Sequence, residues 1–232
     1  TALIEYLISM NNSKDFIVLD FFAGSATTAH AVMNINAKDQ GSRKFILVQI
    51  NDEIDTNKKA YEAGYLTISE ISKQRIRKAA KKIKEENALA SDLDTGFRVL
   101  KIDTSNMKDV YYKPHEIKQA DILDMASNIK EDRGSEDLLF QVMLNWGLSL
   151  SLPVTSKKVQ DKTIYFVGHK TSLGYPLVAC FDALNTEIID AVAQEMPQKF
   201  VFSEDAIQYD QDKTNIKERL KQKSPDTEIK VI

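Results

Sequence analysis

The stretch Phe16-Ile17-Val18-Leu19-Asp20-Phe21-Phe22-Ala23-Gly24-Ser25-Ala26-Thr27-Thr28 decides the fold of this chain. It opens with a continuous β-prone apolar run, which is typical of a strand buried on both faces of a parallel sheet. The small polar residues after it predict a tight turn into a helix, with Ser25 or Thr27 supplying the N-cap oxygen. A second apolar run, Phe45 to Ile50, predicts a second strand. Strand, helix and strand fit one βαβ unit of about 35 residues, so the simplest fold is an α/β sheet.

The flanking segments extend this unit into two predicted domains, residues 1–94 and 95–232. Apolar spacing predicts a helix over residues 2–10 and a long amphipathic helix from about Thr67 to Asn87. The small, polar and acidic residues 88–96 place the domain boundary near residue 95. Patterns in the second domain predict a small α/β fold, with helices at 116–126, 135–149, 186–195 and 212–222, and strands at 163–167, 177–181, 200–202 and 228–232.

The composition favours a soluble cytoplasmic protein. The 232 residues are 43% hydrophobic and 28% charged, the range of ordinary globular proteins, and no apolar run approaches the roughly 18 residues of a membrane span. Cys180 is the only cysteine, so no internal disulfide can form. The three histidines are far apart in sequence and lack the spacing of a zinc motif, so we expect no metal site.

Seven basic residues lie close together on the long helix, between Lys73 and Lys84. Such a segment could contact nucleic-acid phosphates without sequence choice. Lysines on the outer face of an amphipathic helix are more often a solvated surface, and aromatic residues that could stack on bases are not interleaved with them. We therefore favour the solvated surface.

The turn after Asp20 is the strongest candidate for a ligand site. It follows the carboxyl end of a predicted parallel strand, where α/β sheets bind ligands. The backbone amides and dipole of the next helix favour a carboxylate, Gly24 allows close approach, and Asp20 adds an acid, so the turn suits a zwitterion. The dinucleotide fingerprint needs three glycines and the P-loop needs Gly-Lys, and both are missing here. Spacing alone fits an ordinary buried strand–turn–helix equally well.

These residues resemble a known motif. Asp20, Phe22, Gly24, Ser25, Thr27 and Thr28 match the S-adenosylmethionine-binding motif of amino-group DNA methyltransferases, Asp-x-Phe-x-Gly-Ser-Gly-Thr-Thr. Further segments, at 45–49, 61–65, 67–77, 96–106 and 135–140, resemble the adenine-specific modification subunits of type III restriction-modification systems. The resemblance implies a partial Rossmann-like methyltransferase sheet with a second, smaller α/β domain.

The resemblance also implies a cofactor, a set of site residues and partners. S-adenosylmethionine would be bound by Asp20, Phe22, Ala23, Gly24, Ser25, Thr27 and Thr28, with Gln49 at a ribose hydroxyl. DNA, a restriction nuclease/helicase subunit and a second copy of the chain would be its partners. Two positions depart from the family. Ala26 replaces the usual glycine and would be strained at positive φ, and Gln49 stands where related enzymes often have an acid.

The catalytic loop of the family, Asp/Asn-Pro-Pro-Tyr, is missing from this sequence, because none of its five prolines is adjacent to another. We therefore expect the C-terminal part of a DNA adenine-N6 methyltransferase, which carries the cofactor motif but no catalytic residues and is inactive alone. The alternative is a non-catalytic module that dimerises or docks a nuclease. A small-molecule methyltransferase is disfavoured, since the resemblance extends beyond the cofactor motif.

Overall fold

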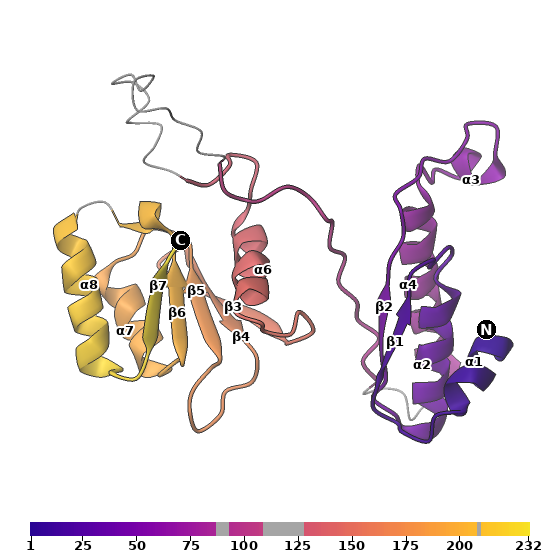
Figure 1. Cartoon of the computed structure of the whole chain (residues 1–232), viewed down its shortest axis with the longest axis horizontal. Helices are drawn as coiled ribbons and strands as arrows, with labels where there is room; N and C mark the ends of the chain where they lie inside the picture. The colour runs from indigo at the N-terminus through magenta and orange to yellow at the C-terminus, as the bar shows by residue number, and fades with distance from the viewer. Residues whose placement is uncertain (87–92, 109–127, 208–209) are drawn as a thin grey trace. The chain divides into compact units, whose positions relative to one another are not determined.

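The computed structural model describes residues 1–86, 93–108, 128–207 and 210–232. The chain forms two compact units, Thr1–Lys101 and Ile102–Ile232, each of which combines helices with a β-sheet (Figure 1). The boundary expected near residue 95 falls shortly before this division, and the helix expected at 116–126 lies outside the described residues. No helix in these ranges is long and apolar enough to cross a membrane.

Unit 1 is built on the predicted strand–helix–strand order, which is confirmed. Strands β1 (Ile17–Asp20) and β2 (Lys44–Leu47) are parallel, with Leu19 opposite Ile46 and Asp20 opposite Leu47. Helix α2 (Thr27–Asp39) connects them, and α1 (Ala2–Ser9) precedes them. After β2 come the short helix α3 (Lys59–Glu62) and the long helix α4 (Ile68–Glu86).

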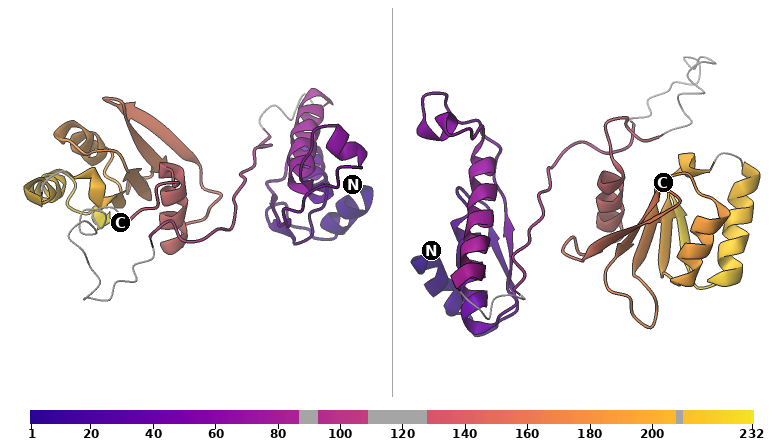
Figure 2. Two further views of the ribbon diagram at one scale, coloured as in Figure 1. Left: turned by 90° about the horizontal axis from the view of Figure 1, so that it is seen from above. Right: turned by 180° about the vertical axis from the view of Figure 1, so that it is seen from behind.

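Helix α2 is the centre of this unit because it is buried on two sides. One side, with Val32 and Ile35, packs with Ile8 of α1. The other side, with Met33 and two alanines, packs against the apolar stripe of α4. The two views of Figure 2 show α4 running along α2 on one face of the strands. The helices of unit 1 therefore cover that face of the sheet and position the turn between β1 and α2.

The opposite face of the β1–β2 sheet is exposed, so the prediction of strands buried on both faces is wrong for the described chain. Ile17, Leu19 and Ile46 are 58%, 51% and 49% exposed, and Val48 is also exposed. These four residues are named the open face below. A parallel sheet normally carries helices on both faces, but α1, α2 and α4 all pack on the other side. The apolar residues of the open face therefore form a surface on which none of α1, α2 and α4 packs.

Arg43 fixes the end of α2 to the start of β2. The Arg43 guanidinium is buried and donates two hydrogen bonds to the Asp39 carboxylate, both at 3.0 Å, and a third to the Ser13 carbonyl at 3.1 Å. It also lies 5.5 Å from the ring centroid of Phe16. These contacts hold the pKa of Asp39 below its usual range, mainly through the hydrogen bonds from Arg43.

This lowered pKa predicts an acid-sensitive contribution to the stability of unit 1. A depressed carboxyl pKa stabilises the fold above the ordinary pKa of about 4, and the contribution disappears as the pH falls through the folded-state value. Asp39→Asn should lower the free energy of unfolding by about 1–3 kcal/mol at pH 7. The difference from wild type should shrink below about pH 4. Chemical denaturation at several pH values measures it, and a difference independent of pH would contradict the assignment.

Unit 2 is a mixed five-stranded sheet with helices on both faces. Its strands lie in the order β3 (Val154–Val159), β4 (Lys162–Val167), β5 (Leu177–Cys180), β6 (Lys199–Phe202) and β7 (Glu228–Val231). The first three are antiparallel neighbours, and the last three are parallel. Helix α7 (Thr186–Gln194) connects β5 to β6, and a short 3₁₀ turn (Glu204–Ala206) and α8 (Asp210–Lys223) connect β6 to β7.

The four predicted strands of unit 2 are present within a residue or two of their expected ends, but β3 was missed. Its centre, Thr155 to Lys158, is polar and exposed, so it lacks an apolar run. Helix α6 (Ser135–Asn145) ends earlier than the predicted 135–149.

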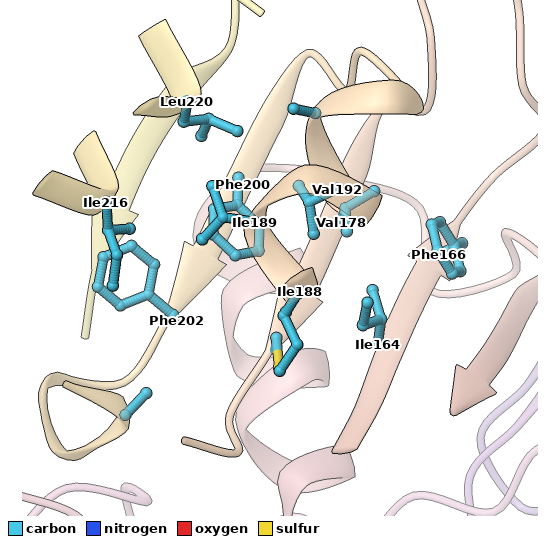
Figure 3. Packing of buried hydrophobic residues seen from close by; sticks show 13 residues of the cluster. Ile164, Phe166, Val178, Ile188, Ile189, Val192, Phe200, Phe202, Ile216 and Leu220 are labelled. Atoms are coloured by element: carbon cyan, nitrogen blue, oxygen red, sulfur yellow. The ribbon is translucent and has the colours of Figure 1, made fainter. Parts of the chain in front are cut away.

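Two apolar layers hold unit 2 together. Figure 3 shows the first, in which Phe200 and Phe202 of β6 pack under α7 and α8 and their ring centroids are 5.5 Å apart. The second layer lies between the other sheet face and α6, and it includes Leu139 and Met143. A surface ion pair, Arg219 to Asp190 at 2.7 Å, also links α8 to α7. Each face of this sheet is thus covered, in contrast to unit 1.

Candidate functional site

The turn between β1 and α2, residues 21–26, is closed by Asp20. One carboxylate oxygen of Asp20 accepts a hydrogen bond from the Phe22 amide at 3.0 Å. The other accepts from the Thr28 hydroxyl at 2.6 Å. Asp20 therefore ties the beginning of the turn to the first turn of α2. Because each carboxylate oxygen has two lone pairs, both still have capacity for a ligand donor.

The residues just after β2 accept hydrogen bonds from the backbone of the turn. The Gly24 amide donates to the Gln49 side-chain oxygen at 2.8 Å, and the Ala23 amide donates to the Val48 carbonyl at 3.1 Å. The Gln49 amide nitrogen donates to the Ile50 carbonyl at 2.9 Å. Gln49, expected at a ribose hydroxyl, thus binds the backbone of the turn. The amides of Phe22, Ala23 and Gly24 are therefore not free for a ligand.

The first turn of α2 does have open donors. The N-cap residue is Ala26, which has no side-chain acceptor, so the prediction that Ser25 or Thr27 caps the helix is wrong. The hydroxyls of Ser25 and Thr27 lie 3.5 Å from each other instead. Among the described residues, the backbone amides of Ser25, Thr27 and Thr28 have no hydrogen-bond acceptor. An uncapped helix start of this kind attracts an anion.

The backbone of the turn is left-handed at two positions. Gly24 has φ 50°, and a Cβ added there would meet only the Phe22 carbonyl oxygen, at 3.8 Å, so the space beside it is open. Ala26 has φ 59° and ψ 40° and is fully buried. A residue with a Cβ is strained in this region by roughly 1–2 kcal/mol. The departure of Ala26 from the glycine of the motif is therefore a strained position in this structure.

Helix α4 contacts the turn through Ser72 and Arg75, two residues that the sequence motif does not include. The Ser72 hydroxyl donates toward the Gly24 carbonyl, and Arg75, one helical turn later, donates to the Ser25 hydroxyl at 2.7 Å. A signal for Ser72 was present in the sequence. Ser72 interrupts the apolar stripe of α4 between Ile68 and Ile76, and a buried hydroxyl in such a stripe needs a polar partner. The sequence pattern predicts Arg75 on the solvated basic face of the helix.

Arg75 brings a positive charge to the turn. Within the described parts of the chain its guanidinium makes one hydrogen bond, to Ser25, and no ion pair with a carboxylate. Burial lowers the pKa of His30, and the charge of Arg75 lowers it further. A cation that is partly withdrawn from solvent and lacks a counter-ion favours an anionic ligand beside it.

The other predicted residues are placed as follows. The ring of Phe22 is 89% exposed, whereas Ala23 of the same turn is buried. Asp20, Gly24, Thr28 and Gln49 are brought together by the hydrogen bonds above. The described residues contain no group of three histidine, cysteine or acidic side chains that could hold a metal ion.

Comparison with known proteins finds a family model that matches this part of the chain. Residues 1–81 match the model of the family described as DNA methylase (N6_N4_Mtase). These residues are therefore similar to the DNA methylase family. The match includes β1, the turn, α2, β2, and both Ser72 and Arg75 of α4.

Three relatives that are named as Mod subunits of type III restriction-modification enzymes confirm the resemblance to this group. The StyLTI Mod subunit of Salmonella typhimurium is 50% identical over 98 residues, which are 42% of this chain and 15% of that protein. The EcoPI Mod subunit of Escherichia phage P1 is 45% identical over 98 residues, with the same coverage. The EcoP15I Mod subunit of Escherichia coli is 42% identical over 96 residues, which are 41% of this chain and 15% of that protein. The matched segment thus spans about 15% of the length of these relatives.

Proposed function

We propose that this chain is part of a site-specific DNA adenine-N6 methyltransferase and that its first unit binds S-adenosylmethionine. The observation that carries the proposal is the uncapped start of α2, where three backbone amides are open beside Gly24. The family match over residues 1–81 supports it. A Rossmann-like sheet, of which β1 and β2 are two strands, is part of the same proposal.

The residues of the turn fit the amino-acid end of this cofactor. Its carboxylate needs donors and positive charge. The open amides of Ser25, Thr27 and Thr28 supply the donors, and Arg75, which pairs with no carboxylate among the described residues, supplies the charge. Its amino group needs an acceptor, which Asp20 provides. The space beside Gly24 admits a ligand close to the backbone.

Each residue of the turn has a defined task in this proposal. Asp20 binds the amino group and keeps the turn closed through Phe22 and Thr28. The Gln49 side-chain oxygen accepts a hydrogen bond from the Gly24 amide. In this proposal Gln49 therefore positions the turn and does not bind a ribose hydroxyl directly. The exposed ring of Phe22 shields the cofactor from water. When bound, S-adenosylmethionine supplies the methyl group that is transferred.

The chemistry at adenine would use residues outside this chain. Methylation of the amino group requires a flipped base, stacked on an aromatic ring and held by acceptors. The five prolines of this sequence are all isolated, so no Pro-Pro-Tyr loop is available here. The relatives are named as Mod subunits of restriction-modification enzymes, which supports DNA as the substrate and a restriction subunit as the partner.

Calorimetry with S-adenosylmethionine tests the cofactor site directly. The wild-type chain should bind, and Asp20→Ala should weaken binding by roughly 10- to 100-fold, because a charged hydrogen-bond partner contributes about 1.5–3 kcal/mol. Asp15→Ala is the matched control, since Asp15 is an exposed carboxylate in the same unit. It should bind like wild type. Circular dichroism of both variants checks that the fold is retained, and equal affinity of Asp20→Ala and wild type would refute the role of Asp20.

A second candidate function is a non-catalytic module that docks a partner or dimerises. The open face favours it, because exposed apolar residues on a sheet face commonly mark a binding surface. The same calorimetric experiment separates the two candidates. If wild-type chain and Asp20→Ala both fail to bind S-adenosylmethionine, the module is the better description.

A further inference from the structure

We infer that Arg75 binds the carboxylate of the ligand of this turn, acting together with the open amides of α2. The inference rests on the proposed function and adds a residue to it from a different part of the chain. In the sequence Arg75 lies 50 positions after Ser25, on a helix whose basic residues otherwise suggest a solvated surface.

The position of Arg75 is fixed by the contacts of α4 with the turn. Ser72 donates toward the Gly24 carbonyl, and Arg75 is three residues further along the same helix, so both face the turn. Ile76 and Ala79 bury the adjoining face of α4 against α2. The guanidinium is therefore held beside Ser25 by a packed helix and does not depend on a flexible loop.

In the described part of the chain, no carboxylate pairs with Arg75. Its one hydrogen bond among the described residues uses a single nitrogen, and the acceptor is the neutral Ser25 hydroxyl. The acid of the turn, Asp20, is engaged by Phe22 and Thr28. Other basic side chains of α4, such as Lys81 and Lys82, pair with glutamates one turn later. The remaining guanidinium nitrogens of Arg75 are thus available to a carboxylate, which Arg binds through two parallel hydrogen bonds.

Two nucleoside probes test this role by calorimetry. S-adenosylhomocysteine carries the amino-acid carboxylate, and 5′-methylthioadenosine lacks the amino-acid end. Arg75→Gln should weaken binding of S-adenosylhomocysteine tenfold or more and leave binding of 5′-methylthioadenosine within about twofold. Arg75→Lys should restore part of the lost affinity, because lysine keeps the positive charge but cannot make two parallel hydrogen bonds to a carboxylate. Lys78→Gln, which removes an exposed charge from the same helix, should behave like wild type.

A second measurement reports the contact between Arg75 and the carboxylate without requiring that 5′-methylthioadenosine bind. Since the charge of Arg75 lowers the pKa of His30, a carboxylate bound at Arg75 should raise that pKa in the wild type. The rise should be absent in Arg75→Gln. Nuclear magnetic resonance titration of His30, with and without S-adenosylhomocysteine, measures it.

The outcomes separate this inference from the proposed function. Equal losses for both probes in Arg75→Gln would mean that Arg75 only supports the turn, and an unchanged His30 pKa on binding would likewise overturn the contact. If S-adenosylhomocysteine binds wild type and Arg75→Gln equally, the inference fails while the cofactor site stands. If the wild type binds neither probe, the proposed function fails as well.

Discussion

Phe200→Ala is expected to lower the free energy of unfolding of unit 2 by about 3–5 kcal/mol. Phe200 is fully buried, and its ring lies at the centre of the layer between the sheet and α7 (Figure 3). The truncation leaves a cavity that the neighbouring strands cannot close, because Phe200 is on β6, which is paired on both sides by β5 and β7. The loss therefore combines lost burial with an unfilled void.

Urea unfolding followed by the fluorescence of Trp146 measures this loss. Trp146 is the only tryptophan of the sequence and packs on the sheet of unit 2, so its signal reports on that unit. Phe22→Ala is the matched control, since Phe22 is the same residue type but 89% exposed. It should leave the transition unchanged. A loss below about 1 kcal/mol for Phe200→Ala would mean that this layer can repack.

Ala26→Val should destabilise unit 1 by about 2–4 kcal/mol and abolish the proposed binding of S-adenosylmethionine. Ala26 is fully buried in the left-handed region at φ 59°. A β-branched side chain increases the backbone strain there, and two more methyl groups would overpack the core between α2 and α4, in which Ala26 is fully buried. A backbone shift that relieves the strain or the overpacking would move the turn and its open amides.

Ala26→Gly is the comparison that isolates the strain. Glycine stabilises the fold by removing roughly 1–2 kcal/mol of backbone strain. It destabilises the fold by about 0.8 kcal/mol through the loss of a buried methyl group, and by a further ~0.4–1 kcal/mol because the unfolded chain gains conformational entropy. The net change should be within about 1 kcal/mol of zero. Hydrogen exchange of the α2 amides, combined with calorimetry of cofactor binding, measures both variants. A Val variant as stable as the Gly variant would show that the left-handed conformation is not required.

The sequence predicted those elements whose local pattern and tertiary environment agree. The period of α4 matches the face that this helix buries, whereas in the apolar run of β1 only Phe16 and Val18 pack against the helices. Strand β3 was missed because its centre is exposed, and the open face was predicted as buried because an apolar run does not reveal whether a cover is present. Such a cover depends on chain elements that local sequence does not specify.

The candidate site was predicted in its local part only. Asp20, Gly24 and Thr28 follow one another in a short segment, so their proximity could be expected from the turn. The N-cap prediction failed since the Ser25 hydroxyl is taken up by Arg75, 50 residues later. The support from Gln49 and Ser72 likewise comes from distant segments that meet at the turn only after folding.

The open face of the β1–β2 sheet also affects which assay can show that this chain is correctly folded in solution. Dyes that fluoresce on apolar surface are widely used to detect molten, partly folded states. Here the native fold itself displays apolar side chains at Leu19 and Ile46, so a bright dye signal would accompany correct folding. Rigid side-chain packing, seen as near-ultraviolet dichroism of the Phe200 layer and Trp146, is therefore the appropriate criterion of a native preparation.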